Sequence, residues 1–138
     1  MTKRELEQQR LANANKFIRK IGDCGRRFFH HEGRYAELSL DGRGRVWFTD
    51  EYSGRRIYTH RDGRWQGFTH GGTLKILVEV FRDHIKKGRQ LHHLYFDPDR
   101  FRGFGTHPWG YPDGELILLK HAGLTLGIVA PAPGEDAS

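Results

Sequence analysis

The first apolar pattern along the chain has the three- and four-residue spacing of a helix buried along one side. Thr2 and Glu5 have the spacing of a capping box, so this helix should begin at the N-terminus. Gly22 and Gly25 should end it. The stripe that would face the core is Leu11, Ala14, Phe17, Ile18 and Ile21.

The next stretch reads as an antiparallel meander, and its turn sequences set the register. Asp41-Gly42-Arg43-Gly44 fits a three-residue hairpin loop, which places Leu38 opposite Phe48. The turn at Glu51-Tyr52-Ser53-Gly54 is ambiguous. We adopt a four-residue loop, which sets Phe48 opposite Ile57 and gathers the apolar side chains on one face. A shift of one residue would scatter them over both faces.

A fourth strand of the meander is predicted from Asp62-Gly63, a pair typical of two-residue hairpins. This turn would set Ile57 opposite Phe68 and His60 opposite Trp65. The sequence therefore predicts four antiparallel strands.

A second helix should cover the apolar face of the meander. Thr73 is its predicted N-cap, and Gly88 should close it after Lys87. The fold class is therefore α+β, with an N-terminal helix, a meander and a packed amphipathic helix. The stripe of this second helix is Leu74, Leu77, Val78, Phe81 and Ile85.

The C-terminal region carries weaker patterns. We expect a short strand over residues 91–96, an irregular loop over 97–114, and two further strands over 115–119 and 124–129. The tail, 131–138, should be frayed.

The length of 138 residues indicates one α+β domain, over residues 1–130. No apolar run approaches the roughly 20 residues of a membrane span, and the charged N-terminus does not resemble a signal peptide, so we expect a cytoplasmic protein that does not bind membranes. Cys24 is the single cysteine, which excludes an intrachain disulfide and a cysteine-based zinc site.

Positive charge is concentrated near the N-terminus. The chain has 23 Lys and Arg against 17 Asp and Glu, and 16 of the basic residues are Arg. The first 34 residues carry nine basic and four acidic residues. Guanidinium groups bind phosphates bidentately, so an anionic partner is indicated. The basic candidates for binding it are Arg19, Lys20, Arg26 and Arg27.

The adopted register places an aromatic and cationic set of residues on the second face of the meander. If this face is exposed, its rings would stack on bases and its cations would contact phosphates. If another element covers it, the rings belong to the core. The candidate binding residues on this face are Arg45, Trp47, Arg56, Tyr58, His60 and Trp65.

Nine histidines raise the question of a metal or hydrolytic site. In a strand, neighbouring side chains point to opposite faces, so the doublets His30-His31 and His92-His93 offer at most one ligand each. The repeated Thr-His pairs at 59–60 and 69–70 lack the order and separation of the 2H phosphoesterase motifs. We assign no catalytic residue, metal ligand or cofactor.

Three runs, at Cys24-Gly25-Arg26-Arg27-Phe28-Phe29, residues 43–60 and Gly71-Gly72-Thr73-Leu74, resemble a group of small proteins carried on proteobacterial plasmids, prophages and integrative elements. The resemblance covers roughly residues 13–90. It implies a mobile genetic element as the genomic setting and implies no mechanism.

The sequence favours a non-enzymatic nucleic-acid-binding accessory protein of a mobile element, with DNA preferred over RNA. The alternative is a protein inhibitor of a host defence system, of the anti-restriction or anti-CRISPR type, because Arg, Tyr and Trp also dominate protein interfaces. A hydrolytic role and the oligomeric state stay open.

Overall fold

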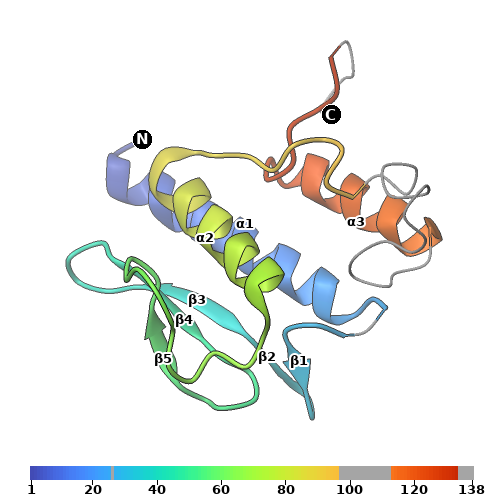
Figure 1. Cartoon of the computed structure of the whole chain (residues 1–138). Coiled ribbons are helices and arrows are strands. Elements are labelled where there is room, and N and C mark those ends of the chain that lie inside the picture. Colours follow the sequence, from blue (N-terminus) through green and yellow to red (C-terminus); the bar gives the residue numbers. More distant parts are fainter. Residues whose placement is uncertain (26, 97–112, 134–138) are drawn as a thin grey trace.

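Three helices and two small antiparallel sheets make up the computed structural model, which describes residues 1–25, 27–96 and 113–133 (Figure 1). This is the α+β class predicted from the sequence. α1 packs against α2, β3 and α3. In chain order the elements are α1 (Lys3–Gly22), β1 (His30–His31), β2 (Arg34–Tyr35), β3 (Glu37–Leu40), β4 (Val46–Thr49), β5 (Arg56–Tyr58), α2 (Gly72–Lys87) and α3 (Asp113–Thr125).

The N-terminal helix begins at the predicted cap. The Thr2 hydroxyl accepts the Glu5 backbone N–H at 3.1 Å and donates to the Glu5 carboxylate at the same distance. Asn15, on the side of α1 that faces β3, accepts the Leu38 N–H at 2.8 Å and donates to the Leu38 carbonyl at 2.9 Å. Four residues of the predicted stripe are fully buried: Ala14, Phe17, Ile18 and Ile21.

The register of the three-stranded sheet is confirmed. Leu38 pairs with Phe48, and Phe48 pairs with Ile57. The Asp50 N–H donates to the Arg55 carbonyl at 3.0 Å, which closes the four-residue loop adopted for the middle turn. The apolar side chains of β3, β4 and β5 therefore point toward the helices.

The predicted fourth strand does not form: within the described part of the chain, this sheet ends at β5. The Thr59 N–H and hydroxyl both donate to the Val46 carbonyl, at 3.3 and 2.7 Å. Between Thr59 and His70 the backbone–backbone hydrogen bonds beyond this one are local, such as the 3.2 Å bond from the Phe68 N–H to the Trp65 carbonyl. Phe68 therefore does not pair with Ile57.

Hydrogen bonds that involve side chains take the place of the strand pairing that the fourth strand would have made. Asp50 accepts the Thr69 N–H at 2.8 Å, and the Glu51 carboxylate lies 2.5 Å from His70 Nε2. The Ser53 hydroxyl donates to the Gly67 carbonyl at 2.5 Å. We call this set of contacts the polar clasp; its residues are Asp50, Glu51, Ser53, Gly67, Thr69 and His70. It ties the β4–β5 turn to the segment before α2.

α2 has the predicted apolar stripe and the predicted end. Gly88 closes it in the left-handed conformation, with φ of 78°, which glycine adopts without strain. The N-cap is Gly71, two residues before the predicted Thr73, and its helix start has no side-chain cap. The buried residues of the stripe are Leu74, Leu77, Val78, Phe81 and Ile85.

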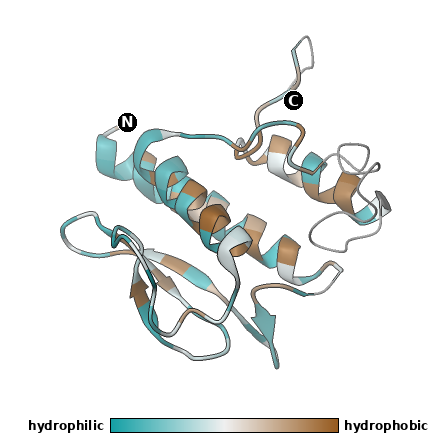
Figure 2. Cartoon of the chain, viewed as in Figure 1, coloured by the Kyte–Doolittle hydropathy of each residue, from teal (hydrophilic) through white to brown (hydrophobic). Residues whose placement is uncertain are grey.

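The C-terminal prediction of two strands is wrong, because residues 113–125 form α3. Hydrophobic and hydrophilic residues alternate along this helix (Figure 2), and hydrophobic ones lie on both its buried and its exposed sides. Its sequence therefore lacks the one-sided period by which helices are recognised. Gly123 is buried within it, and a Cβ there would lie 2.3 Å from Val129 Cγ2. This glycine permits a close approach inside a helix and does not mark a turn.

The remaining C-terminal expectations are met only in small part. Of the strand expected over residues 91–96, Leu91 alone forms a bridge, a parallel one with Val129. Of the predicted loop 97–114, residues 97–112 lie outside the described residues, as do 134–138 of the predicted frayed tail.

The hairpin of β1 and β2 was not predicted from the sequence. His30 pairs with Tyr35, and their rings stack with centroids 4.2 Å apart. Arg27, Phe29 and Glu32 have positive φ angles of 57°, 66° and 48°. Such angles are rare for bulky residues, and strand patterns do not predict them.

His84, on α2, should make stability depend on pH. Its side chain is buried, and Nδ1 lies 2.9 Å from the Arg89 carbonyl. Burial lowers the pKa of His84 below its ordinary value, whereas in the unfolded chain histidine titrates near pH 6.5. The unfolded state therefore takes up the proton first, and the free energy of unfolding should fall as the pH drops below about 6.5.

The measurement is urea unfolding of the parent and of His84→Gln from about pH 7.5 to about pH 5.5. The parent should lose more stability over this range than the variant. Equal pH dependence in both proteins would contradict the assignment to His84.

Candidate aromatic–arginine site

The outer face of the three-stranded sheet carries the predicted cluster, which we call the aromatic–arginine face. Trp47 pairs with Tyr58, and Thr49 pairs with Arg56, across β4 and β5. Because side chains alternate along a strand, these residues point away from the buried Phe48. The residues of the face are Arg45, Trp47, Arg56, Tyr58 and His60.

The rings of this face contact one another and two guanidinium groups. The Trp47 and Tyr58 centroids are 5.2 Å apart at an angle of 50°. Arg56 Cζ lies 4.6 Å from the Trp47 ring centroid, and Arg45 Cζ lies 5.7 Å from that of Tyr58. Both rings are half-buried, so each offers part of its surface to a partner.

Asp41 holds Trp47 and Arg45 in place. Its Oδ2 accepts the indole N–H of Trp47 at 2.9 Å and the Nε–H of Arg45 at 2.8 Å. These bonds, led by the one from Trp47, hold the pKa of Asp41 well below its ordinary value. Arg45 is therefore engaged in an ion pair. Arg56 has no ion pair within the described residues, and its charge is available to an anion.

The predicted fourth strand required Trp65 to lie on the exposed face. In the structure it does not lie there. Only 4% of its surface is exposed. It forms the wall of a recess of about 520 Å³ beside the aromatic–arginine face. Lys75 Nζ lies 4.8 Å from its ring centroid. The residues that line the recess are Trp47, Arg56, Ile57, Tyr58, Arg61, Trp65 and Gln66.

His60, a predicted binding residue, makes a hydrogen bond to the backbone of β4. Its Nε2 accepts the Val46 N–H at 3.2 Å. Desolvation lowers the pKa of His60, and the nearby charges of Arg82 and Lys86 lower it further. His60 is thereby tied to the backbone of β4, and it contributes less positive charge to the face than an ordinary histidine would.

The N-terminal basic candidates lie on a different surface. Arg19 Cζ stacks 5.0 Å from the Tyr35 ring centroid, and Arg27 Nη2 lies 3.2 Å from His30 Nδ1. Arg19 and Lys20 line a groove of about 500 Å³ along α1 and α3, which shares no residue with the recess. Arg26 lies outside the described residues.

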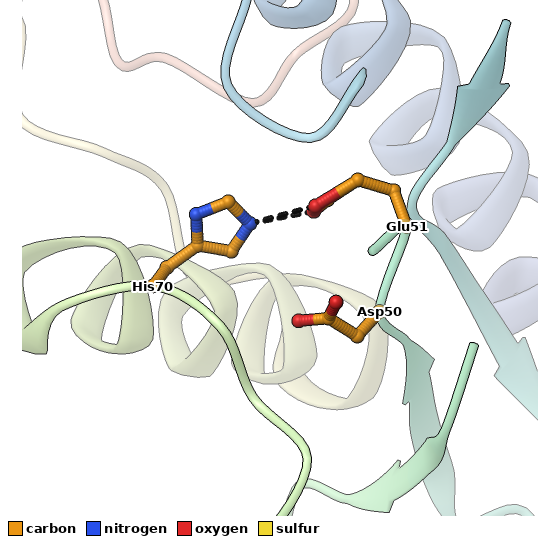
Figure 3. Close-up of side chains that lie close together, drawn as sticks. All are labelled: Asp50, Glu51 and His70. Carbon is orange, nitrogen blue, oxygen red and sulfur yellow. Dashed lines mark hydrogen bonds and ion pairs between the residues drawn. The ribbon is translucent and has the colours of Figure 1, made fainter. Parts of the chain in front are cut away.

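The polar clasp contains a cluster that the sequence analysis missed, because its members are far apart in the chain. Ligand atoms of Asp50, Glu51 and His70 lie within 4.8 Å of one another (Figure 3). Asp50, however, already accepts two N–H groups of its own turn at 2.9 Å and both donors of Thr69. Its lone pairs are occupied, so this carboxylate does not fit an ion.

The fold and the site define a small α+β protein with a basic, aromatic sheet face. The family model for YoqU matches residues 5–112, so the chain belongs to the YoqU family. A curated relative, the "SPbeta prophage-derived uncharacterized protein YoqU" of Bacillus subtilis (strain 168), is 28% identical over 83 residues. The match covers 59% of this chain and 61% of that protein. No solved structure matches the chain significantly.

This relative refines the resemblance seen in the sequence. Its prophage origin supports a family of small prophage-derived proteins and does not support proteobacterial plasmids specifically. Among the described residues, no helix is both long and apolar enough to cross a membrane.

Proposed function

We propose that this protein binds nucleic acid through the aromatic–arginine face. The observation that carries the proposal is Arg56, which lies 4.6 Å from the Trp47 ring beside Tyr58 and has no acidic partner in the described residues. A cation next to ring surface suits a ligand that combines phosphates with flat bases. The relative of this chain is derived from a prophage, and nucleic acid is a ligand compatible with such an origin.

The surroundings of the face favour an anion. Residues 41–64 carry six Arg, no Lys and four acidic residues. Two of the acidic residues, Asp50 and Glu51, are buried within the polar clasp. The surface charge of this region is therefore more positive than its composition suggests. Guanidinium groups bind phosphates with two parallel hydrogen bonds, which adds directional selectivity to attraction.

The proposal is tested by salt-dependent binding of a labelled oligonucleotide. The double variant Arg56→Gln and Arg61→Gln should bind more weakly, and its log-log salt slope should be shallower by about two, about one per lost phosphate contact. Fluorescence anisotropy at several salt concentrations gives both values.

The matched control is Arg4→Gln with Arg34→Gln, which removes the same charge from two exposed positions outside the face. It should keep most of the affinity. Equal losses of affinity in the two double variants would show non-specific electrostatic attraction. No binding of the parent protein to the oligonucleotide at about 50 mM salt would contradict the proposal.

The alternative, a protein inhibitor of host defence, is favoured by one observation. Ile117 and Leu118 of α3 are 57% and 64% exposed, near a groove whose rim includes Arg19 and Lys20. Exposed apolar groups next to charges are typical of protein interfaces. Inhibition of a restriction or Cas nuclease that is lost in Leu118→Gln and kept in the Arg56/Arg61 variant would support this alternative.

A further inference from the structure

We propose that the recess beside Trp47 and Tyr58 accepts an unstacked base, so that the preferred ligand is single-stranded nucleic acid. This inference rests on the proposed function and specifies its substrate class. The recess has a volume of about 520 Å³, which is within the about 300–1,000 Å³ of typical small-ligand sites.

The wall that Trp65 gives the recess is apolar and fixed. The Trp65 side chain is only 4% exposed. The Trp65 indole N–H donates to the Arg61 carbonyl at 2.9 Å, and its ring meets the Phe68 ring edge-to-face with centroids 5.5 Å apart. A rigid apolar wall of this kind gains affinity by excluding water from a flat ligand without ordering new groups.

The rim of the recess is polar and exposed. Arg56 and Arg61 are exposed beside it, where they can contact the phosphates that flank an inserted base. Gln66 is also exposed, and its amide has no hydrogen-bond partner within the described residues. An amide offers both a donor and an acceptor, which matches the edge of an unpaired base.

A duplex does not match these features. In double-stranded DNA the faces of the bases are stacked inside the helix, and only their edges reach the grooves. A recess with aromatic walls at Trp47 and Tyr58 gains from the face of a base, which an unstacked strand presents and a duplex hides. The concave site therefore selects single strands.

The first experiment compares three ligands of equal length: a ten-nucleotide thymidine strand, a duplex, and a ten-unit abasic strand. The abasic strand has the phosphates and lacks the bases. The thymidine strand should bind about tenfold or more tightly than either of the others, because stacking contributes about 5- to 150-fold per base.

The second experiment uses Tyr58→Leu and the control Tyr52→Leu. Tyr52 is 66% exposed on the β4–β5 turn and does not line the recess. Tyr58→Leu should lose most of the preference for thymidine over the abasic strand while its salt slope stays unchanged. Tyr52→Leu should keep the preference. Circular dichroism melts are used to check that both variants are folded.

The outcomes separate the two proposals. No binding to any of the three ligands would overturn both the proposed function and this inference. Binding that is as tight for the duplex or the abasic strand as for thymidine would overturn the single-strand inference and leave nucleic-acid binding standing. An unchanged preference in folded Tyr58→Leu would place the bases outside the recess.

Discussion

Replacing Asp50 with alanine should lower the free energy of unfolding by about 3–4 kcal/mol. This buried carboxylate accepts the N–H groups of Tyr52 and Ser53 at 2.9 Å, and the N–H and hydroxyl of Thr69 at 2.8 and 2.9 Å. Hydrogen bonds to a charged group are stronger than neutral ones, and their loss leaves donors unpaired. The β4–β5 turn and the segment before α2 should loosen together.

The effect is measured by urea unfolding at neutral pH, with Asp62→Ala as the control. Asp62 is exposed and lies outside the helices and strands, so its replacement should change stability by no more than about 0.5 kcal/mol. A loss below about 1 kcal/mol in Asp50→Ala would contradict the role given to the polar clasp.

Asp50 should also contribute to acid unfolding. Burial by itself would raise its pKa, but the N–H groups of Ser53, Thr69 and Tyr52 lower it overall. An unfolded aspartate titrates near pH 3.9, so the unfolded state takes up the proton first. The stabilisation is complete above that pH and is lost as the pH falls through the lower pKa of the folded protein.

Replacing His70 with alanine should lower the free energy of unfolding by about 3 kcal/mol. His70 Nε2 lies 2.5 and 2.9 Å from the two Glu51 oxygens (Figure 3). The Glu51 side chain is only 3% exposed. Without His70 this carboxylate would be buried without its hydrogen-bond partner, and a buried polar group left unsatisfied is costly.

The double variant Glu51→Met and His70→Leu should be markedly more stable than His70→Ala. It removes both polar side chains, and the rings of Phe28, Phe29 and Phe68 around His70 can pack against apolar side chains. Urea unfolding of both variants gives the comparison. If the double variant is as unstable as the single one, the cost is due to lost packing and not to an unsatisfied carboxylate.

Much of the fold could be predicted because turn sequences and apolar spacing agreed. The loop after Leu40 and the four-residue turn after Asp50 fixed the pairing of Leu38 with Phe48 and of Phe48 with Ile57. One residue of slip would have exposed half of the apolar side chains, so the register was strongly constrained.

The fourth strand and α3 were mispredicted for different reasons. The chain does bend at Gly63, with φ of 80°, but a turn sequence does not show whether the chain after it finds a partner. In that segment, side-chain hydrogen bonds such as the one from the Thr69 N–H to Asp50 take the place of strand pairing. In α3, exposed Leu118 and buried Gly123 obscured the helical period.

The candidate site was predicted in part. Alternation along β4 and β5 placed Trp47, Arg56 and Tyr58 on one face, and the structure brings them together. The recess was not predictable, because it depends on Trp65 in a segment that has no regular structure. The separation of Arg19 from this face also needed the tertiary arrangement.

The amide of Asn15 has a consequence for how the sheet meets other molecules. By accepting and donating at Leu38, it occupies the backbone positions that a neighbouring strand would use on β3. At the opposite edge, β5 has three residues and is flanked by exposed Arg55. Short, charged edges resist strand addition, the usual first step of β-aggregation. Both edges of this sheet therefore disfavour the addition of a further strand.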